Sequence, residues 1–291
     1  MAQIKKRHSA NIEGDFFVDD SCIDCDACRG LAPEIYERED DQSIVFHQPD
    51  NDKERYEALI GLIACPTSSI GTTEKAEDLQ SAKESLPIKI HENVYFCGYN
   101  SKKSYGAASY FIQREAGNIL IDSPRFSATF SRSLKELGGV RYHYLTHIDD
   151  VADHQKYHDL FQCDRILHKD DIASSTKDME IQPDGLEPFP LDTDLMVIPV
   201  PGHTKGHTVL LYQNRYLFTG DHLAYSHHLE HLYGFRNHCW YSWDRQIKSM
   251  ETLLDYSFEW VLPGHGRRYH CSSPEIMKKE LGKCIRWMKT V

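Results

Sequence analysis

Four short apolar runs in this chain each end in a histidine or an aspartate, and this repeated pattern limits the fold more than any other feature of the sequence. A short apolar run bounded by turn residues is typical of a buried strand, and polar groups at successive strand ends meet along one edge of a sheet. We therefore expect an α/β domain with a site along that edge. The runs lead into the segments Thr146–His154, Gly202–His207, Gly220–His222 and Gly264–Gly266.

Strands and helices are expected to alternate from Ile88 onward, because period-two apolar runs there are separated by turn residues and helical patterns. The expected strands are Val94–Cys97, Ala108–Gln113, Asn118–Ser123, Arg141–Thr146, Arg165–His168, Leu195–Val200, Thr208–Tyr212, Arg215–Thr219 and Trp260–Pro263. The expected helices are Phe126–Leu137 and Val151–Phe161.

The negative charge of the chain lies in its N-terminal part. Residues 1–86 hold 9 Lys/Arg against 19 Asp/Glu, whereas the later residues hold 24 against 25. An acidic surface does not suit nucleic acid or an anionic membrane, because binding phosphate requires basic patches. It suits docking to a basic protein surface, and it is equally compatible with a charged domain that simply stays in solution.

Localisation is predicted from what the sequence lacks and from its cysteines. No apolar run reaches the roughly 18 residues that a membrane helix needs, and the N-terminus has no apolar stretch typical of a secretion signal. The nine cysteines are an odd number, and four of them have metal-site spacing, which favours a reducing compartment over a disulfide framework. We expect a cytoplasmic protein.

Those four cysteines have the spacing of an iron–sulfur site. Cys22, Cys25 and Cys28 are each two residues apart, and Cys65 follows much later. Three thiolates in so tight a loop can reach adjacent iron atoms while a distant fourth completes the set. The proline after the fourth cysteine ends a helix expected over 53–63. The segment resembles the single-cluster bacterial ferredoxins, which implies one [4Fe-4S] cluster; structural zinc is the alternative, although zinc sites more often use two separated pairs.

The later part of the chain, over roughly 88–291, resembles the metallo-β-lactamase fold, an αββα sandwich whose metals lie between two sheets. The resemblance rests on the order of the motifs, each at an expected strand end. With the cysteine segment and the polar stretch after it, the expected domains are a ferredoxin-like α+β domain over 1–75, a polar linker over 76–87 and the sandwich over 88–291. The matching motifs are Asp122, the Thr146–His154 segment, Gly202-His203, Gly220-Asp221 and Gly264-His265.

The residue types in these motifs also favour a metal site on physical grounds. His203, Asp221 and His265 each follow a glycine, which lets the backbone turn sharply and leaves the side chain free to reach a shared point. Neutral imidazoles bind iron, zinc or manganese, and an ionised aspartate can bridge two cations.

The segment after His147 departs from the family pattern. Asp149 stands where the family has a second histidine, and the expected Asp-His pair, Asp153 and His154, arrives two residues late. One interpretation is a two-residue insertion, with Asp153 and His154 still serving as metal ligands. On a helix that begins here, Asp150 and His154 share one face, as do Asp149 and Asp153. The alternative is that Asp149 or Asp150 caps that helix. The predicted metal ligands are His147, Asp149, Asp153, His154, His203, Asp221 and His265, with Asp150 left open.

The added carboxylate shifts the expected metal toward iron, with zinc and manganese as alternatives. Two histidines and one carboxylate, here His147, His203 and Asp221, are the set associated with non-haem Fe(II). The resemblance extends to flavodiiron proteins, which have Glu at the second-His position and bind two irons, and to sulfur dioxygenases, which bind one. The sequence leaves open one metal or two.

His222 follows the bridging aspartate directly and is the candidate catalytic proton donor. The loop after it is rich in histidine and aromatic residues, and in this family such a loop often walls the substrate cavity. The alternative is a packed insert with surface histidines. The loop residues concerned are His227, His228, His231, His238, Tyr225, Tyr233, Trp240, Tyr241 and Trp243.

Three functions are compatible with these motifs. The favoured one is a redox enzyme whose cluster exchanges electrons with a one- or two-iron site that acts on a small oxidant or a sulfur compound. A metal-dependent hydrolase of a thioester, lactone or phosphoester with a structural or regulatory cluster is the alternative, and a non-catalytic redox sensor is the third. The expected partners are a small-molecule substrate and, because no flavin module is recognisable, an external electron-donor protein. Analogy with flavodiiron proteins implies a homodimer.

Overall fold

The cysteine-rich N-terminal segment folds as a small α+β domain in the computed structural model, which describes residues 2–291. The helix predicted over 53–63 is present as α2; β1 pairs antiparallel with β4, and β2 with β3. Helix α2 begins after Asn51, whose side chain accepts a hydrogen bond from the Glu54 N–H, and ends at Cys65. The elements are η1 (Ile4–Lys6), β1 (Phe16–Val18), α1 (Ala27–Leu31), β2 (Tyr36–Glu39), β3 (Gln42–Val45), α2 (Asp52–Ala64) and β4 (Ile70–Thr72).

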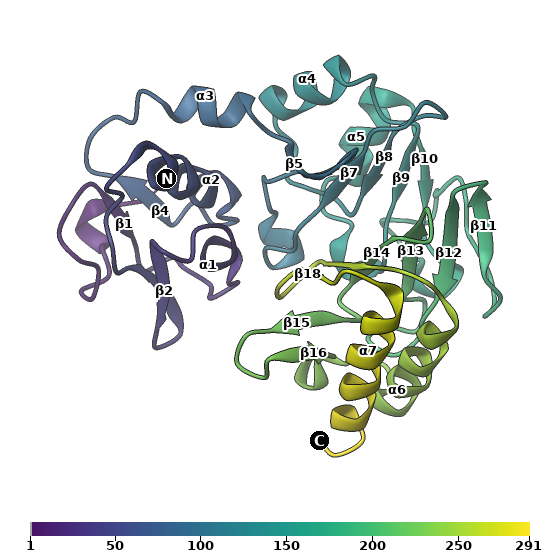
Figure 1. The fold of residues 1–291 in the computed structure, drawn as a ribbon. Coiled ribbons are helices and arrows are strands. Elements are labelled where there is room, and N and C mark those ends of the chain that lie inside the picture. The colour runs from purple at the N-terminus through teal and green to yellow at the C-terminus, as the bar shows by residue number, and fades with distance from the viewer. Residues whose placement is uncertain (1) are drawn as a thin grey trace. The chain divides into compact units, whose positions relative to one another are not determined.

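Contacts divide the chain into two compact units. The first runs to Arg141 and includes Ala152–Cys163, and the second consists of Tyr142–Val151 and Asp164–Val291. Within the first unit, β5 to β8 form an antiparallel meander (Figure 1), and its strands β7 and β8 are buried throughout. The further elements of this unit are α3 (Leu79–Glu84), β5 (Ile88–His91), β6 (Val94–Phe96), η2 (Lys102–Ser104), β7 (Tyr110–Ile112), β8 (Ile119–Ile121), α4 (Ala128–Glu136) and α5 (His154–Phe161).

The polar segment predicted to be a linker holds helix α3. Ala82 and Leu86 are buried there, in the same hydrophobic cluster as Phe16 of β1 and Phe130 of α4. Two apolar side chains therefore anchor an otherwise polar stretch in the core of the first unit. The domain limits at 75 and 87 are not tested by this division and stay a prediction.

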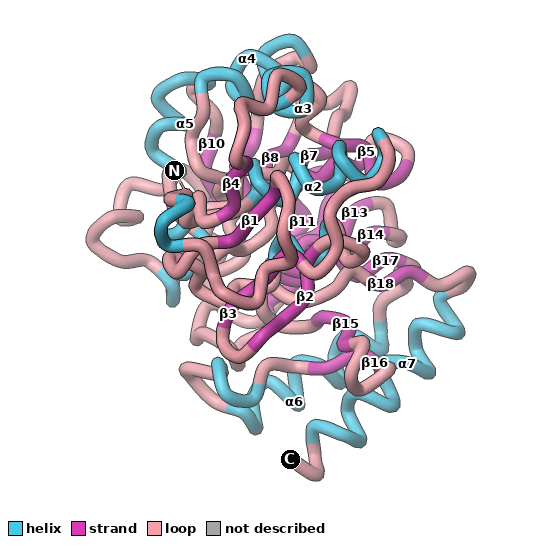
Figure 2. Tube along the Cα trace, turned by 90° about the vertical axis from the view of Figure 1, so that its left-hand side faces the viewer, coloured by secondary structure: helices cyan, strands magenta, loops and turns pink. Residues whose placement is uncertain are grey.

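The second unit is built around a sheet of order β11-β12-β13-β14-β17-β18, antiparallel except where β14 meets β17. Val209, Leu217 and Val261 of this sheet pack with Met250 of α6 and Leu281 of α7. Figure 2 shows both helices near the hairpin β15–β16, which packs on α7. The elements are β9 (Tyr142–Tyr144), η3 (Ile148–Asp150), β10 (Asp164–Ile166), η4 (Lys169–Asp171), β11 (Phe189–Asp192), β12 (Leu195–Pro199), β13 (Thr208–Tyr212), β14 (Tyr216–Gly220), β15 (Ala224–Ser226), β16 (His231–Tyr233), η5 (Arg236–His238), α6 (Trp243–Thr252), η6 (Leu253–Asp255), β17 (Trp260–Pro263), β18 (Tyr269–His270) and α7 (Pro274–Met288).

Each predicted strand is present, several of them shorter, but the helix predicted from Val151 is wrong at its start. Asp149 and Asp150 belong to the short turn η3, and α5 begins only at His154. Ala152 interrupts the helical path with a φ of 23°. Asp150 and His154 therefore do not share a helix face, and neither Asp149 nor Asp150 is the N-cap residue of α5. Among residues 2–291, no helix is both long and apolar enough to cross a membrane.

Candidate functional site

The four cysteines predicted to bind a cluster line one cavity in the first unit. Cys22 and Cys25 lie in the loop before α1, Cys28 lies in α1, and Cys65 is the residue that ends α2. Local sequence places them there, because the tight loop turns through left-handed residues at positions 24 and 26. The cavity is lined further by Val18, Ile23, Ser43, Pro66, Thr67, Ser69 and Ile70.

The surroundings of these sulfurs fit an iron–sulfur cluster. The backbone N–H groups of Ser43 and Ser69 point at the Sγ atoms of Cys22 and Cys65, at 3.3 and 3.2 Å, and such donors stabilise cluster thiolates and tune their potential. Burial raises the pKa of the Cys25 thiol to about 12. Without a bound metal this buried sulfur would therefore stay protonated, so thiolate formation here is coupled to metal binding.

The spacing of the sulfurs disfavours the zinc alternative. A tetrahedral zinc site with Zn–S bonds of about 2.3 Å brings its sulfurs to within about 3.8 Å of one another. Among residues 2–291, the groups of three or more potential ligand atoms lying within 4.8 Å of one another include no cysteine. No three of the cysteine sulfurs therefore lie close enough together here to share one zinc ion.

A loop from the later part of the chain covers the cluster cysteines, and the sequence did not indicate this. Tyr105 donates a hydrogen bond from its hydroxyl to the carbonyl of Ile23. Gly106 has a φ of 89°, and a Cβ at this position would lie 2.8 Å from the Sγ of Cys25. Only glycine permits so close an approach with this backbone conformation.

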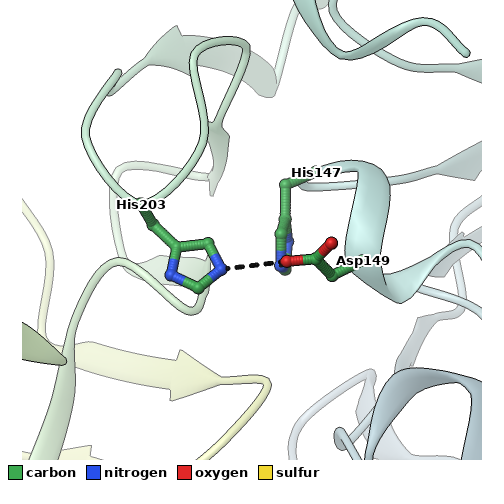
Figure 3. A group of neighbouring side chains, drawn as sticks. All are labelled: His147, Asp149 and His203. Carbon is green, nitrogen blue, oxygen red and sulfur yellow. Dashed lines mark hydrogen bonds and ion pairs between the residues drawn. The ribbon is translucent and has the colours of Figure 1, made fainter. Parts of the chain in front are cut away.

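The second unit holds the candidate metal centre, and its candidate ligands follow strand ends. His147, Asp149 and His203 form one group, with ligand atoms within 4.8 Å of one another (Figure 3). The Asp149 Oδ2 lies 3.3 Å from the Nε2 of His203 and 3.7 Å from the Nε2 of His147. The two imidazole planes are nearly perpendicular, at 85°. The aspartate in the second-His position of the family thus lies among the potential ligands.

A second group shares His147 and adds two carboxylates. His147, Asp150 and Asp221 also have ligand atoms within 4.8 Å of one another. His265 lies beside them, with its Nδ1 2.8 Å from the Oδ1 of Asp221. Asp150, which the sequence left open, is therefore one of the potential ligands. Because His147 belongs to both groups, the arrangement is compatible with one cation or with two adjacent ones.

Protonation states at this centre are those that metal binding requires. Burial lowers the pKa of His147 to about 4, against the opposing effect of the Asp221 carboxylate. Burial alone would raise the pKa of Asp221, but His265 and His147 hold it well below its usual range. The hydrogen bond to His203 lowers the pKa of Asp149. At neutral pH the His147 imidazole is therefore neutral and both carboxylates are ionised.

One buried nitrogen without a hydrogen-bond partner indicates whether these residues suit a metal ion. The Nε2 of His147 is buried and has no hydrogen-bond partner among residues 2–291. A buried polar atom without a partner is costly. A cation held by His147 together with Asp149, Asp150, His203 or Asp221 would satisfy it, so the residues present fit the group.

The glycines before the ligands act mainly by leaving space. Of these three glycines only Gly220 has a left-handed backbone, with a φ of 48°, and a Cβ there would lie 2.4 Å from the Oγ1 of Thr146. Gly202 instead packs against Gln246, whose Cα would lie 2.5 Å from an added Cβ. At Gly264 an added Cβ would lie 2.9 Å from a ligand carboxylate. These positions exclude larger residues because two segments meet there.

Asp153 and His154, the other predicted ligands, belong to neither group. Asp153 accepts hydrogen bonds from the Phe126 N–H at 2.9 Å and from Lys103 at 3.1 Å, and forms an ion pair with Lys156 at 3.1 Å. Burial alone would raise the pKa of Asp153, but these contacts lower it. Its carboxylate already has partners in the first unit, and the ligand role of both residues stays a prediction.

His222 and Asp122 follow strand ends, as expected. His222 is fully buried after β14, and burial lowers its pKa to about 3, so its imidazole is neutral at neutral pH. Gln246 donates a hydrogen bond to its carbonyl at 3.1 Å. The proton-donor role of His222 stays a prediction. Asp122 is buried directly after β8, with a φ of 54°.

His207 is a residue of the site that the sequence analysis did not single out as functional. It is fully buried and stacks on His147, with ring centroids 4.7 Å apart. Its Nε2 accepts a hydrogen bond from the Asp221 N–H at 3.2 Å. The signal that could have found it is the Gly206-His207 pair, which repeats Gly202-His203 four residues later.

The aromatic loop comes close to the metal centre at one point. Trp240 is 63% exposed, and its ring centroid lies 6.2 Å from that of His203. The backbone N–H groups of Trp240 and Tyr241 both donate to the His203 carbonyl. The Trp240 ring thus lies beside a candidate ligand, and the contact of this loop with substrate stays a prediction.

Comparisons with known proteins agree with both parts of the sequence analysis. Residues 18–72 match the family model described as the 4Fe-4S single cluster domain of Ferredoxin I. The solved structure of DIM-1 metallo-beta-lactamase is similar at 18% identity and a TM-score of 0.51, covering 67% of this chain and 95% of that one. A metallo-beta-lactamase from Hirschia baltica is similar at 14% identity and a TM-score of 0.50, covering 69% and 95%. No curated protein sequence matches.

The α/β domain has the metallo-β-lactamase fold. The N-terminal segment that holds the four cysteines matches the 4Fe-4S single-cluster ferredoxin model. The predicted family resemblance and fold class are both confirmed. Neither the activity nor the identity of the metal follows from similarities at this level of identity.

Proposed function

We propose that the protein is a redox metalloenzyme in which the [4Fe-4S] cluster exchanges single electrons with an iron site in the metallo-β-lactamase-fold domain. The proposed substrate is a small oxidant or a sulfur compound. The observation that carries the proposal is the position of Asp149, whose Oδ2 lies 3.3 Å from His203 and 3.7 Å from His147. A carboxylate there, in addition to Asp150 and Asp221, favours iron over zinc.

The residues of the chain have distinct parts in this proposal. His147, Asp149 and His203, together with Asp221, would hold the iron, which when bound supplies one-electron chemistry at a site where Asp149 is half-exposed. Trp240 and Tyr241 would contact the substrate. The cysteines supply the electron store, and an external donor protein with a basic face would supply electrons at the acidic N-terminal domain.

Metal analysis tests the identity of the site. Anaerobically purified protein should contain iron beyond the four cluster atoms, visible by Mössbauer spectroscopy as a component distinct from the cluster. Stoichiometric zinc in the second unit, together with activity that does not change when the cluster is reduced, would contradict the proposal.

A variant pair tests the role of the cluster. Cys25→Ala should abolish turnover that depends on electrons while leaving the second metal bound. Cys271→Ser is the matched control, because the Cys271 Sγ donates to the backbone carbonyls of Glu259 and Ser273 in its own unit and lies outside the cluster cavity. Full activity in Cys25→Ala would favour the alternative function over the redox one.

That alternative is a metal-dependent hydrolase of a thioester, lactone or phosphoester, with a structural or regulatory cluster. The observation that favours it is the fold, which the chain shares with metallo-β-lactamases. The two ligand groups that share His147 would suit a pair of cations. Hydrolysis without any added reductant would support this function.

A further inference from the structure

A buried carboxylate outside the ligand set joins the two loops that carry the metal ligands. Asp171 ends the turn η4 and is 5% exposed. Its Oδ2 accepts hydrogen bonds from the Ile148 N–H at 3.0 Å and from the Thr204 hydroxyl at 2.6 Å. Its Oδ1 accepts from the Gly206 N–H at 2.7 Å. One side chain therefore connects three donors from two segments that are distant in sequence.

Each of the three hydrogen-bond donors is next in sequence to a candidate ligand or to His207, which stacks on His147. Ile148 lies between His147 and Asp149, and Thr204 follows His203 directly. Gly206 precedes the buried histidine that stacks on His147. Hydrogen bonds to an ionised carboxylate are shorter and stronger than those between neutral groups. The distance between the two loops, and with it the spacing of the ligands, is thus set at Asp171.

The position of Asp171 is itself fixed on both sides. The His168 side chain caps η4, since its Nδ1 accepts from the Asp170 N–H at 3.2 Å and its Nε2 lies 2.9 Å from the Gly185 carbonyl. On the other side, a Cβ at Gly206 would lie 2.6 Å from the backbone nitrogen of Asp171. The close approach therefore depends on glycine at this position.

We propose that Asp171 is a positioning residue of the metal centre. It holds His147, Asp149 and His203 at the spacing that a cation requires, and its charge raises the affinity of the site for that cation. Asp171 belongs to neither group of potential ligands, so it acts through the loops. Outer contacts of this kind typically change metal affinity by about 10–100-fold. The inference rests on the proposed metal centre but not on its redox activity.

The test compares Asp171→Asn with a matched neighbour. Asparagine keeps the size of the side chain but removes the charge and turns one acceptor into a donor that faces an N–H or hydroxyl. Asp170→Asn is the control, because Asp170 is next in sequence, partly exposed and paired with Lys205 outside the site. Both variants are made in the full-length, cluster-loaded protein, and Co²⁺ serves as the probe.

Asp171→Asn should bind Co²⁺ about 10–100-fold more weakly and shift its visible absorption bands, whereas Asp170→Asn should stay within about twofold of the parent protein. If Asp171→Asn does not fold, Thr204→Val removes one of the three bonds and should give a smaller loss of affinity with the same spectral shift. Unchanged affinity and spectrum in the folded variants, with only a lower melting temperature, would overturn the role of Asp171. A parent protein that binds no Co²⁺ at all would instead overturn the metal centre itself.

Discussion

Three of the four cluster cysteines lie within the short stretch Cys22–Cys28, whereas the candidate ligands of the metal centre follow the ends of separate strands between His147 and Asp221. In the cluster site, neighbouring backbone N–H groups hold the sulfurs. In the metal centre, the ligands depend on contacts between distant segments, such as those that Asp171 makes with Ile148 and Thr204. Local sequence therefore determines most of the cluster site, whereas the metal centre depends on the packing of the domain.

The largest expected effect follows from removing the ligand that both groups share. His147→Ala should weaken binding of Co²⁺ or Fe²⁺ by more than about 100-fold, because loss of a ligand costs more than loss of an outer contact. The cluster should be unaffected, which ultraviolet–visible absorption would check. His265→Ala is the comparison, because His265 contacts Asp221 and belongs to neither ligand group, so this variant should lose less affinity. Equal losses in both variants would show that His265 is a direct ligand.

Removing a cluster cysteine should give the converse result. Cys65→Ala should lose the broad visible absorption of the cluster and lower the stability of the first unit, since metal binding contributes to folding. The second unit should keep its affinity for Co²⁺. Loss of both sites in this variant would break the comparison, because it would show that the centre depends on the cluster for its structure.

A glycine pair separates backbone strain from contact with the cluster loop. Gly106→Ala should destabilise the protein by about 1–3 kcal/mol, because it meets Cys25 and adopts an unfavourable φ. Gly185 has a similar φ of 84° but nothing within 4 Å of an added Cβ, so Gly185→Ala reports the cost of the backbone alone. Thermal melts and the cluster midpoint potential should both change more in Gly106→Ala. Identical changes would mean that the contact with Cys25 contributes nothing.

The smallest expected effect is a difference in pH dependence of the metal-free protein. The folded pKa of His147 is about 4, below its ordinary value, so its contribution to stability is present above pH 6.5 and is lost as the pH falls toward 4. The folded pKa of Cys25 is raised to about 12, so its contribution is present below pH 9 and is lost as the pH rises toward 12. The free energy of unfolding in urea should vary less with pH on the acid side in His147→Asn than in the parent protein. On the alkaline side it should vary less with pH in Cys25→Ala. If the pH dependence of unfolding is the same in these variants as in the parent protein, other titratable groups determine it.

Much of both sites could be predicted because their residues obey local rules. Cysteine spacing is sufficient for the cluster, since a loop of fixed length presents its sulfurs in few ways. The apolar runs predicted β9, β12, β14 and β17, and therefore the strand ends that carry His147, His203, Asp221 and His265. A short apolar run bounded by turn residues is enough to locate a buried strand.

Only the tertiary structure decided which side chains near those strand ends come together. Asp149 and Asp150 belong to the ligand groups because a break at Ala152 ends the turn η3, so that Asp153 and His154 start a separate helix and Asp153 binds lysines instead. No local pattern indicates such a break. The contacts of Asp171, of His207 and of Gly106 with Cys25 likewise join segments far apart in the chain. Their partners follow from packing, which a sequence read residue by residue does not contain.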